Sequence, residues 1–183
     1  GANGANRLSG NAITEALVFG RQAGRSAAAH AKTLDAPLAS ETAARPIVDL
    51  LDMDAGGKTN IAEMVQKLQA TMADDVGPFR DAAKLARALT TINDLTSDLG
   101  DRPAGSRGAF DMQRLDWLDM RNMLLVARSV TQAALARTES RGAHQREDYP
   151  DTRPEWQGNQ VTRWRDGHLN LRRMSIAPAE ALA

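Results

Sequence analysis

The sequence predicts a mainly α fold: an antiparallel three-helix bundle of the spectrin-repeat kind, a short C-terminal β-hairpin, and a separate N-terminal helix. Three observations support this prediction. Alanine is abundant and aromatic residues make up only 4% of the chain, which favours helices. Three long segments place apolar residues at steps of three and four. The C-terminal region instead alternates in polarity around an Asp-Gly turn.

The N-terminal region predicts a turn followed by a helix and a linker. The opening GANGANRLSGN is rich in glycine and asparagine, which favour turns. A helix is expected from Ala12 to about Lys32, with a stripe of small side chains that allows close approach to another backbone. Residues 33–46 contain two prolines and no apolar periodicity, and therefore predict a linker. The small stripe consists of Ala16, Gly20, Gly24, Ala27 and Ala31.

Three helices are expected to form the bundle. The first should have Thr59 as its N-cap and end at Gly77-Pro78, and Pro78 should open the second helix, which ends at Gly100. The third should run from Met112 to Ala136, and its apolar positions cover more than one face, which predicts a central position. The apolar faces of the first two helices are Ile61, Met64, Val65, Leu68, Met72 and Val76, and Ala82, Leu85, Ala86, Leu89, Ile92 and Leu99.

The segment NQVTRWRDGHLNLRRMSI predicts a two-stranded ribbon. Its residues alternate between two faces, and Asp166-Gly167 is a strong hairpin-turn signal. Because an isolated ribbon of two strands is only marginally stable, it should lean on the bundle or on a partner.

Composition and motifs argue against several functions. Lys+Arg and Asp+Glu number 23 each, and this balance gives no support for a nucleic-acid-binding protein. The absence of cysteine removes disulfides, thiolate metal sites and cysteine nucleophiles, and no segment approaches the length of a membrane span. The GGKT segment lacks the earlier glycine of a phosphate loop. The histidines, His30, His144 and His168, are scattered, so no metal site is expected.

Two stretches remain candidates for a site. In GANRLSGNAI, a glycine-rich backbone leads into a helix whose first N–H groups suit an anion or a polarised carbonyl, with Arg7 just ahead. An ordinary capped helix with a surface arginine has the same pattern. The other stretch is RTESRGAHQREDYPDTRPEW, called here the charged segment (residues 137–156). It fits either an anion site or a charged loop closed by salt bridges.

Together these stretches resemble a known family. GANRLSGNAITEALVFGRQAG resembles the flavin- and substrate-binding segment of succinate dehydrogenase and fumarate reductase flavoprotein subunits, and L-aspartate oxidase carries a similar segment. RTESRGAHQREDYP is similar to the signature in the C-terminal region of the same superfamily. MVQKLQATMADDVGPFRD and RNMLLVARSVTQAALARTESRGAH resemble its helical domain. The resemblance covers nearly the whole chain.

The resemblance implies a flavin and substrate site near the N-terminus. Arg7 is similar to the arginine that binds a substrate carboxylate beside the flavin. Asn11, Ala12 and Ile13 would bind the cofactor, with the backbone N–H groups of Ala12 and Ile13 facing the pyrimidine edge of the flavin. The family usually has Ser-Leu at the last two positions, so the serine hydroxyl contact is missing here.

The resemblance places the charged segment against the flavin domain. Arg141, His144 and Arg146 are therefore expected to form a domain junction and to do no chemistry. The acidic residues next to them offer local partners for the arginine charges. These are Glu139, Glu147 and Asp148.

The resemblance also implies a domain organisation. Residues 1–45 would be the tail of the FAD-binding domain, with the flavin and substrate loop, a helix left over from that domain, and the linker. Residues 46–156 would be the three-helix bundle of the C-terminal domain, and residues 157–183 the β-hairpin and C-terminal tail. The family's Gly-x-Gly-x-x-Gly turn and capping domain do not occur in the sequence. The chain is therefore expected to be the C-terminal piece of a longer flavoprotein, inactive alone and unable to hold FAD tightly.

The full-length parent is expected to be an FAD-dependent oxidoreductase that interconverts succinate and fumarate. Its expected partners are the FAD-binding and capping domains of the same chain, a dicarboxylate substrate and an iron–sulfur subunit, with no nucleic acid. It is expected in the cytoplasm, at the inner face of the membrane through partner subunits. Two alternatives stay open: an L-aspartate oxidase acting on an amino dicarboxylate, and a non-catalytic helical interaction module.

Overall fold

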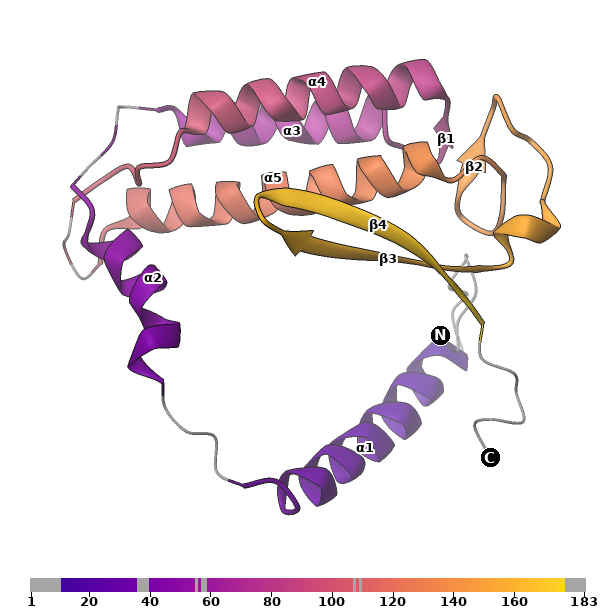
Figure 1. Cartoon of the computed structure of the whole chain (residues 1–183), viewed down its shortest axis with the longest axis horizontal. Helices are drawn as coiled ribbons and strands as arrows, with labels where there is room; N and C mark the ends of the chain where they lie inside the picture. The colour runs from indigo at the N-terminus through magenta and orange to yellow at the C-terminus, as the bar shows by residue number, and fades with distance from the viewer. Residues whose placement is uncertain are drawn as a thin grey trace. The chain divides into compact units, whose positions relative to one another are not determined.

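The computed structural model describes residues 11–35, 40–54, 56, 59–106, 108 and 110–176. The chain divides between Pro46 and Ile47 into two compact units. The first unit carries α1 (Asn11–Ala31), which matches the helix expected from Ala12 to about Lys32. The second unit carries the bundle, the charged segment and the hairpin (Figure 1). The mainly α architecture with a C-terminal hairpin is therefore confirmed.

Helix α2 (Glu41–Asp52) shows that the predicted linker was too long. Pro46 lies inside this helix and supplies no N–H, which is why the segment looked irregular in the sequence. Ser40 caps the start of the helix. The Ser40 side-chain oxygen accepts from the Ala43 N–H at 3.2 Å, which satisfies one of the donors that a helix start leaves free.

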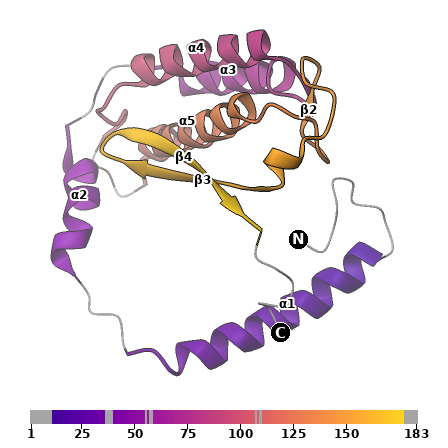
Figure 2. The same ribbon diagram turned by 45° about the vertical axis from the view of Figure 1, so that its right-hand side comes forward.

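The bundle consists of α3 (Ile61–Asp74), α4 (Ala82–Leu99) and α5 (Met112–Ala136). The three helices lie side by side, and α5 contacts α3, α4 and strand β3 (Gly158–Arg165) (Figures 1 and 2). The structure thus contains the predicted three-helix bundle, in which every helix contacts the other two and the third helix, α5, also contacts the hairpin.

The start of α3 differs from the prediction by one residue. The N-cap is Asn60 rather than Thr59, and its side-chain oxygen accepts from the Glu63 N–H at 3.3 Å. Glu63 also accepts from the Asn60 amide at 3.4 Å. The Asn60 side chain thus binds both the N–H and the carboxylate of Glu63, which explains why the helix begins after Asn60. The helix ends at Asp74, before the predicted Gly77-Pro78 stop.

Pro78 does not open α4, contrary to the prediction. The next two residues form β1 (Phe79–Arg80), which pairs in parallel with β2 (Gln145–Arg146) from the charged segment. The helix starts after Asp81, whose carboxylate accepts from the Lys84 N–H at 2.7 Å. A pairing between segments so far apart in the sequence leaves no local pattern, so sequence periodicity could not reveal it.

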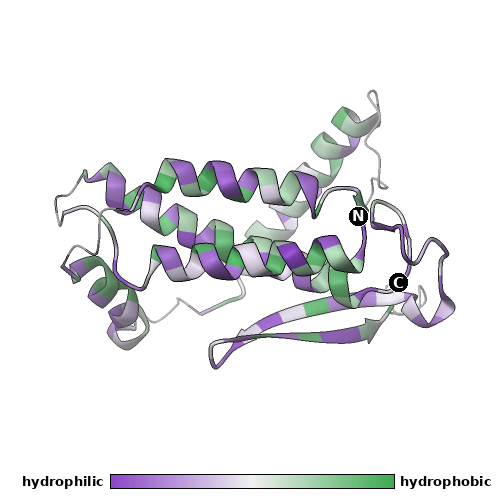
Figure 3. Cartoon of the chain, turned by 90° about the horizontal axis from the view of Figure 1, so that it is seen from above, coloured by the Kyte–Doolittle hydropathy of each residue, from purple (hydrophilic) through white to green (hydrophobic). Residues whose placement is uncertain are grey.

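The hydrophobic core lies between the three bundle helices. Colouring by hydropathy shows apolar and polar bands alternating along each of them (Figure 3). Trp117 is 1% exposed, and its indole N–H donates to the Leu99 carbonyl at 3.2 Å. Burial of apolar area supplies the main stabilisation here. The buried members of this cluster are Met64, Leu68, Ile92, Leu95, Leu99, Ala104, Trp117, Met120, Leu124 and Ala127.

Strands β3 (Gly158–Arg165) and β4 (His168–Ser175) form the predicted antiparallel hairpin. Asp166 and Gly167 have φ of 53° and 76°, the left-handed conformation that a tight two-residue turn requires. The hairpin contacts α5, where the Gln160 side-chain amide donates to the Ala133 carbonyl at 3.2 Å. Figures 1 and 2 both show it alongside that helix.

Candidate functional site

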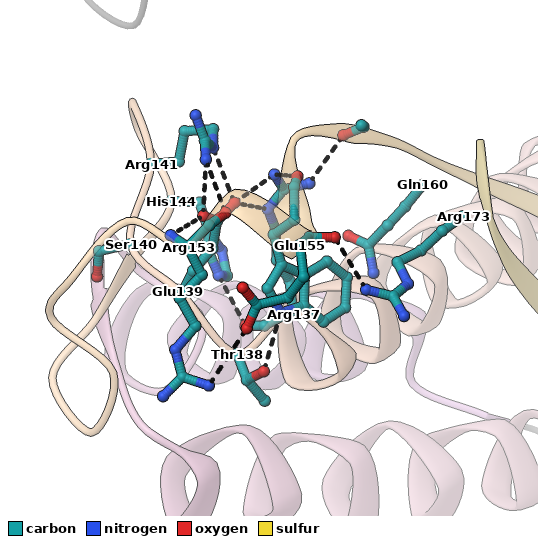
Figure 4. A network of polar contacts seen from close by, with 12 residues as sticks. Arg137, Thr138, Glu139, Ser140, Arg141, His144, Arg153, Glu155, Gln160 and Arg173 are labelled. Atoms are coloured by element: carbon teal, nitrogen blue, oxygen red, sulfur yellow. Dashed lines mark hydrogen bonds and ion pairs between the residues drawn. The ribbon is translucent and has the colours of Figure 1, made fainter. Parts of the chain in front are cut away.

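The charged segment (residues 137–156) leads from the end of α5 to the hairpin, and Figure 4 shows its polar network. Glu139 lies at the centre, with a side chain that is 0% exposed. Its carboxylate accepts from the Arg137 guanidinium, from Arg141 Nε and Nη2 at 2.9 and 3.0 Å, and from the Arg153 N–H at 2.8 Å. The hydrogen bonds from Arg141 do most to lower the pKa of Glu139 to about 2. Glu139 is therefore ionised at neutral pH despite its burial.

Arg146 is the second buried charge and closes the C-terminal end of α5. Its guanidinium binds both carboxylate oxygens of Asp148 at 2.7 Å. Its Nη1 donates to the carbonyls of Ala134 and Leu135 at 3.0 Å and of Arg137 at 3.2 Å. These carbonyls have no partner within the helix, and a cation there also suits the helix dipole.

Asp148 and Glu147 join this helix end to the start of α4. Asp148 accepts from the Ala82 N–H at 3.0 Å, and its pKa is lowered to about 2, chiefly by the Arg146 hydrogen bonds. The Glu147 N–H donates to the Arg80 carbonyl at 2.8 Å, and the Glu147 carboxylate pairs with Lys84 at 2.8 Å. The charged segment thus ties two bundle helices together.

His144 is held by the backbone of the same segment. Its Nε2 lies 3.2 Å from the Arg137 carbonyl. Burial is the largest cause of its lowered pKa, and the nearby positive charges of Arg80, Arg137 and Arg146 act in the same direction. The imidazole is therefore neutral at neutral pH, with a proton on Nε2 that it donates to the carbonyl.

Two aromatic rings complete the network. The Tyr149 ring lies near the guanidinium groups of Arg146 and Arg153, 5.0 and 5.1 Å from its centroid. The Trp156 ring lies 5.5 Å from the Arg137 guanidinium and is also near that of Arg173 on the hairpin. Such contacts favour cations, so the rings help to hold the arginines in place.

The structure brings Arg141, His144 and Arg146 into one cluster, and only one of the three expected acidic partners pairs elsewhere. Arg141 and Arg146 bind Glu139 and Asp148, as their spacing suggested. Glu147 was expected to serve the same arginines, and it pairs with Lys84 instead. The sequence offered no signal for Lys84, because its position in α4 looks like an ordinary solvated one.

The predicted flavin residues belong to the first unit. Arg7 lies outside the described residues. Asn11, Ala12 and Ile13 form the first turn of α1, where backbone N–H groups have no partner within the helix. That turn contains no acidic residue to compete for these donors. This donor set fits a polar flavin edge, and the assignment of these residues stays a prediction.

Sequence reasoning assigned no role to Arg80, and it included Arg137 in the charged segment without naming it among the junction residues. Arg137 lies at the C-cap of α5 and donates to Glu139 and to the Gly158 and Trp156 carbonyls. Arg80 follows the predicted helix boundary at Gly77-Pro78, and only the pairing of β1 with β2 brings it to the charged segment.

The described residues contain neither a membrane span nor a metal cluster. None of the helices in this part of the chain is long and apolar enough to span a membrane. Within the same residues, no group of three or more His, Cys, Asp or Glu side chains could hold a metal ion.

Known proteins are similar to this chain in both sequence and fold. The family described as fumarate reductase flavoprotein C-term matches residues 65–180. A CoM/CoB fumarate reductase chain of Methanothermobacter marburgensis is 40% identical, and the match covers 85% of this chain and 28% of that protein. L-aspartate oxidase of Caulobacter vibrioides is 38% identical over 84% of this chain and 24% of its own length.

A solved structure contains a chain with a similar fold. The Mycobacterium smegmatis Sdh1 complex in the apo form contains a chain that is 36% identical, with a TM-score of 0.76 over 92% of this chain and 30% of that one. This chain therefore spans less than a third of the length of these relatives. Because the family match covers more than half of the chain and the fold agrees, the chain belongs to the fumarate reductase and succinate dehydrogenase flavoprotein family, of which it represents the C-terminal part.

Proposed function

We propose that this chain is the C-terminal part of an FAD-dependent oxidoreductase that interconverts succinate and fumarate and exchanges electrons with an iron–sulfur subunit. The observation that carries the proposal is the family match over residues 65–180. The family consists of FAD-dependent flavoproteins, so FAD is the cofactor of the full-length protein. We also propose that the parent works in the cytoplasm, at the inner face of the membrane through its partner subunits.

The N-terminal unit would supply one wall of the active site. When bound, FAD supplies hydride transfer to or from a dicarboxylate carbon. In the proposal, Arg7 holds a substrate carboxylate by two parallel hydrogen bonds. The first-turn N–H groups of Ala12 and Ile13 face the flavin edge, where a helix N-terminus stabilises negative charge on the reduced ring. These residues orient and stabilise the reactants but do not complete a catalytic set.

An L-aspartate oxidase is the second candidate, because a relative with that name is 38% identical to this chain. The two functions differ in one substrate group, an amine on the dicarboxylate. Turnover of the full-length protein with succinate and with L-aspartate, measured with an artificial electron acceptor, distinguishes them. We expect succinate oxidation; oxidation of L-aspartate alone would replace the first proposal by the second. A stand-alone helical interaction module, also left open by the sequence, has no comparable observation in its favour.

We further propose that the charged segment holds domains of the parent together and takes no part in chemistry. The support lies in how its polar groups are used. The Glu139 carboxylate, the Arg146 guanidinium and the His144 Nε2 all bind groups of this chain. The expected result for His144→Ala in the parent is a less stable enzyme that keeps its turnover per bound flavin. Abolished turnover with unchanged stability and flavin content would contradict the proposal.

The same organisation predicts how the chain behaves alone. Because the Gly-x-Gly-x-x-Gly turn of a dinucleotide-binding fold does not occur in this sequence, the isolated 183-residue chain should neither take up FAD stoichiometrically nor oxidise succinate. Titration with FAD, followed by the quenching of flavin fluorescence, measures this directly. Tight stoichiometric uptake would show that the cofactor site is complete within the chain.

A further inference from the structure

A basic pocket opens beside the charged segment. Its volume is about 510 Å³, and it lies between β1, the end of α5 and the start of β3. We call it the Arg80 pocket. Three arginines and one histidine line it: Arg80, Arg137, Arg141 and His144. Among the described residues that line it, none is a carboxylate.

Arg80 differs from the other arginines around it. Arg137, Arg141 and Arg146 each donate to a carboxylate. The Arg80 side chain has no hydrogen bond or ion pair with any residue that the structure describes, and its Nε is buried without a partner. A buried donor without an acceptor costs about 1–3 kcal/mol in general, and more when it is charged. The fold therefore holds a cation where nothing in the described chain compensates it.

The backbone of Arg80 is fixed in place. Arg80 pairs with Arg146 in the β1–β2 ladder, and the Arg80 carbonyl accepts from the Glu147 N–H at 2.8 Å. Burial first, and the Arg146 charge second, lower the pKa of Arg80, which still leaves it protonated at neutral pH. The backbone pairing therefore holds Arg80 at the edge of the pocket that its side chain lines.

The neighbouring arginines leave the pocket with excess positive charge. Arg137 and Arg141 share the single carboxylate of Glu139. Together with Arg80, three guanidinium groups face one carboxylate, which leaves a surplus of two positive charges. Arg141 also has spare donors, because its hydrogen bonds within the described chain use Nε and Nη2 and leave Nη1 without an acceptor.

We propose that the Arg80 pocket binds a carboxylate, with Arg80 and Arg141 as its donors. A guanidinium group matches the planar geometry of a carboxylate, and two arginines in this cluster, Arg141 with Glu139 and Arg146 with Asp148, already bind both carboxylate oxygens in this way. The carboxylate has two possible sources. One is a free dicarboxylate, and the other is an Asp or Glu side chain from the remainder of the parent chain. The second source rests on the proposed function, whereas carboxylate binding by the isolated chain does not.

Titration of the 183-residue chain with succinate at constant ionic strength tests the proposal. The Arg80 Nε–H signal, observed by NMR, should shift and saturate. Arg80→Gln should weaken succinate binding about tenfold or more, because it removes a charged donor. Arg172→Gln is the matched control, since it removes the same charge from an exposed position on the hairpin. It should leave binding unchanged.

Stability gives a second, independent measurement. If Arg80 serves a ligand, Arg80→Gln should leave the free energy of unfolding without ligand unchanged or raise it, because it removes an uncompensated cation near Arg146. A lower stability would assign Arg80 a structural role and overturn the proposal. Equal succinate binding by the wild type and Arg80→Gln, no saturable binding, or binding of inorganic phosphate but not succinate would also overturn it.

The parent protein distinguishes the two sources. If a side chain of the parent fills the pocket, succinate will not shift the Arg80 signal there, and Arg80→Gln will destabilise the parent but not this chain. If a free dicarboxylate is the ligand, the parent will bind succinate at this pocket as the isolated chain does. Failure of the proposed function would appear as absent succinate turnover in the parent and would leave the titration of this chain unaffected.

Discussion

The bundle core and the centre of the charged segment are both buried, but different interactions stabilise them. Around Ile92 and Trp117 the core excludes water from apolar side chains, an effect without direction that tolerates small changes of shape. Around Glu139 and Arg146 the charged segment keeps ionised groups away from water, and each of them depends on particular partners. It follows that removing one partner should harm the second region far more than trimming one methyl harms the first.

Glu139→Ala should have the largest effect. It would leave the side chains of Arg137 and Arg141 without their shared carboxylate, and breaking a buried pair in this way costs about 3–5 kcal/mol. Urea unfolding of the variant and the wild type measures the loss. Glu155→Ala is the control, since that carboxylate is largely exposed and lies 3.9 Å from Arg153. Equal effects for the two variants would remove the distinction between a buried and an exposed carboxylate.

Ile92→Val should have a smaller effect. Ile92 is fully buried in the core, and removing one methyl group there costs about 1 kcal/mol. The cost should not change with salt, because no charge is involved. Unfolding in low and high salt tests both points. A loss as large as that of Glu139→Ala would mean that the apolar core is as intolerant of change as the charged segment.

Lys84→Gln should have the smallest effect of the three. Lys84 and Glu147 form an ion pair at 2.8 Å, but both side chains are accessible to solvent, so screening weakens the pair. The stability change should be below that of Ile92→Val and should vanish in high salt. A cost comparable to that of Glu139→Ala would show that the exposed rim of the charged segment contributes as much as its buried centre.

The two regions also differ in how well the sequence predicts them. The apolar residues of α3, α4 and α5 recur every three or four positions, which is why the bundle could be predicted from residues such as Leu68, Leu85 and Leu124. The Asp166-Gly167 turn likewise predicted the hairpin. Errors arose where a single polar side chain decides a boundary, as at Asn60.

The sequence identified the charged segment but did not predict most of its contacts. Its alternating charges suggested ion pairs, and the pairs of Arg141 and Arg146 follow from their spacing. The contacts to Arg80, Lys84 and Ala82 connect positions more than sixty residues apart, and no local pattern encodes them. The Arg80 pocket depends on these contacts, so only the folded chain reveals it.

The ionisation of Glu139 tests most directly whether the charged segment is a buried ionic core. Its pKa is lowered from 4.5 to about 2, so its contribution to stability should be present above pH 4.5 and should be lost as the pH falls through about 2. An NMR titration of the Glu139 carboxyl carbon in the folded chain measures this value. A buried ionic core predicts a midpoint near 2, far below that of an exposed glutamate; a midpoint at or above 4.5 would contradict it.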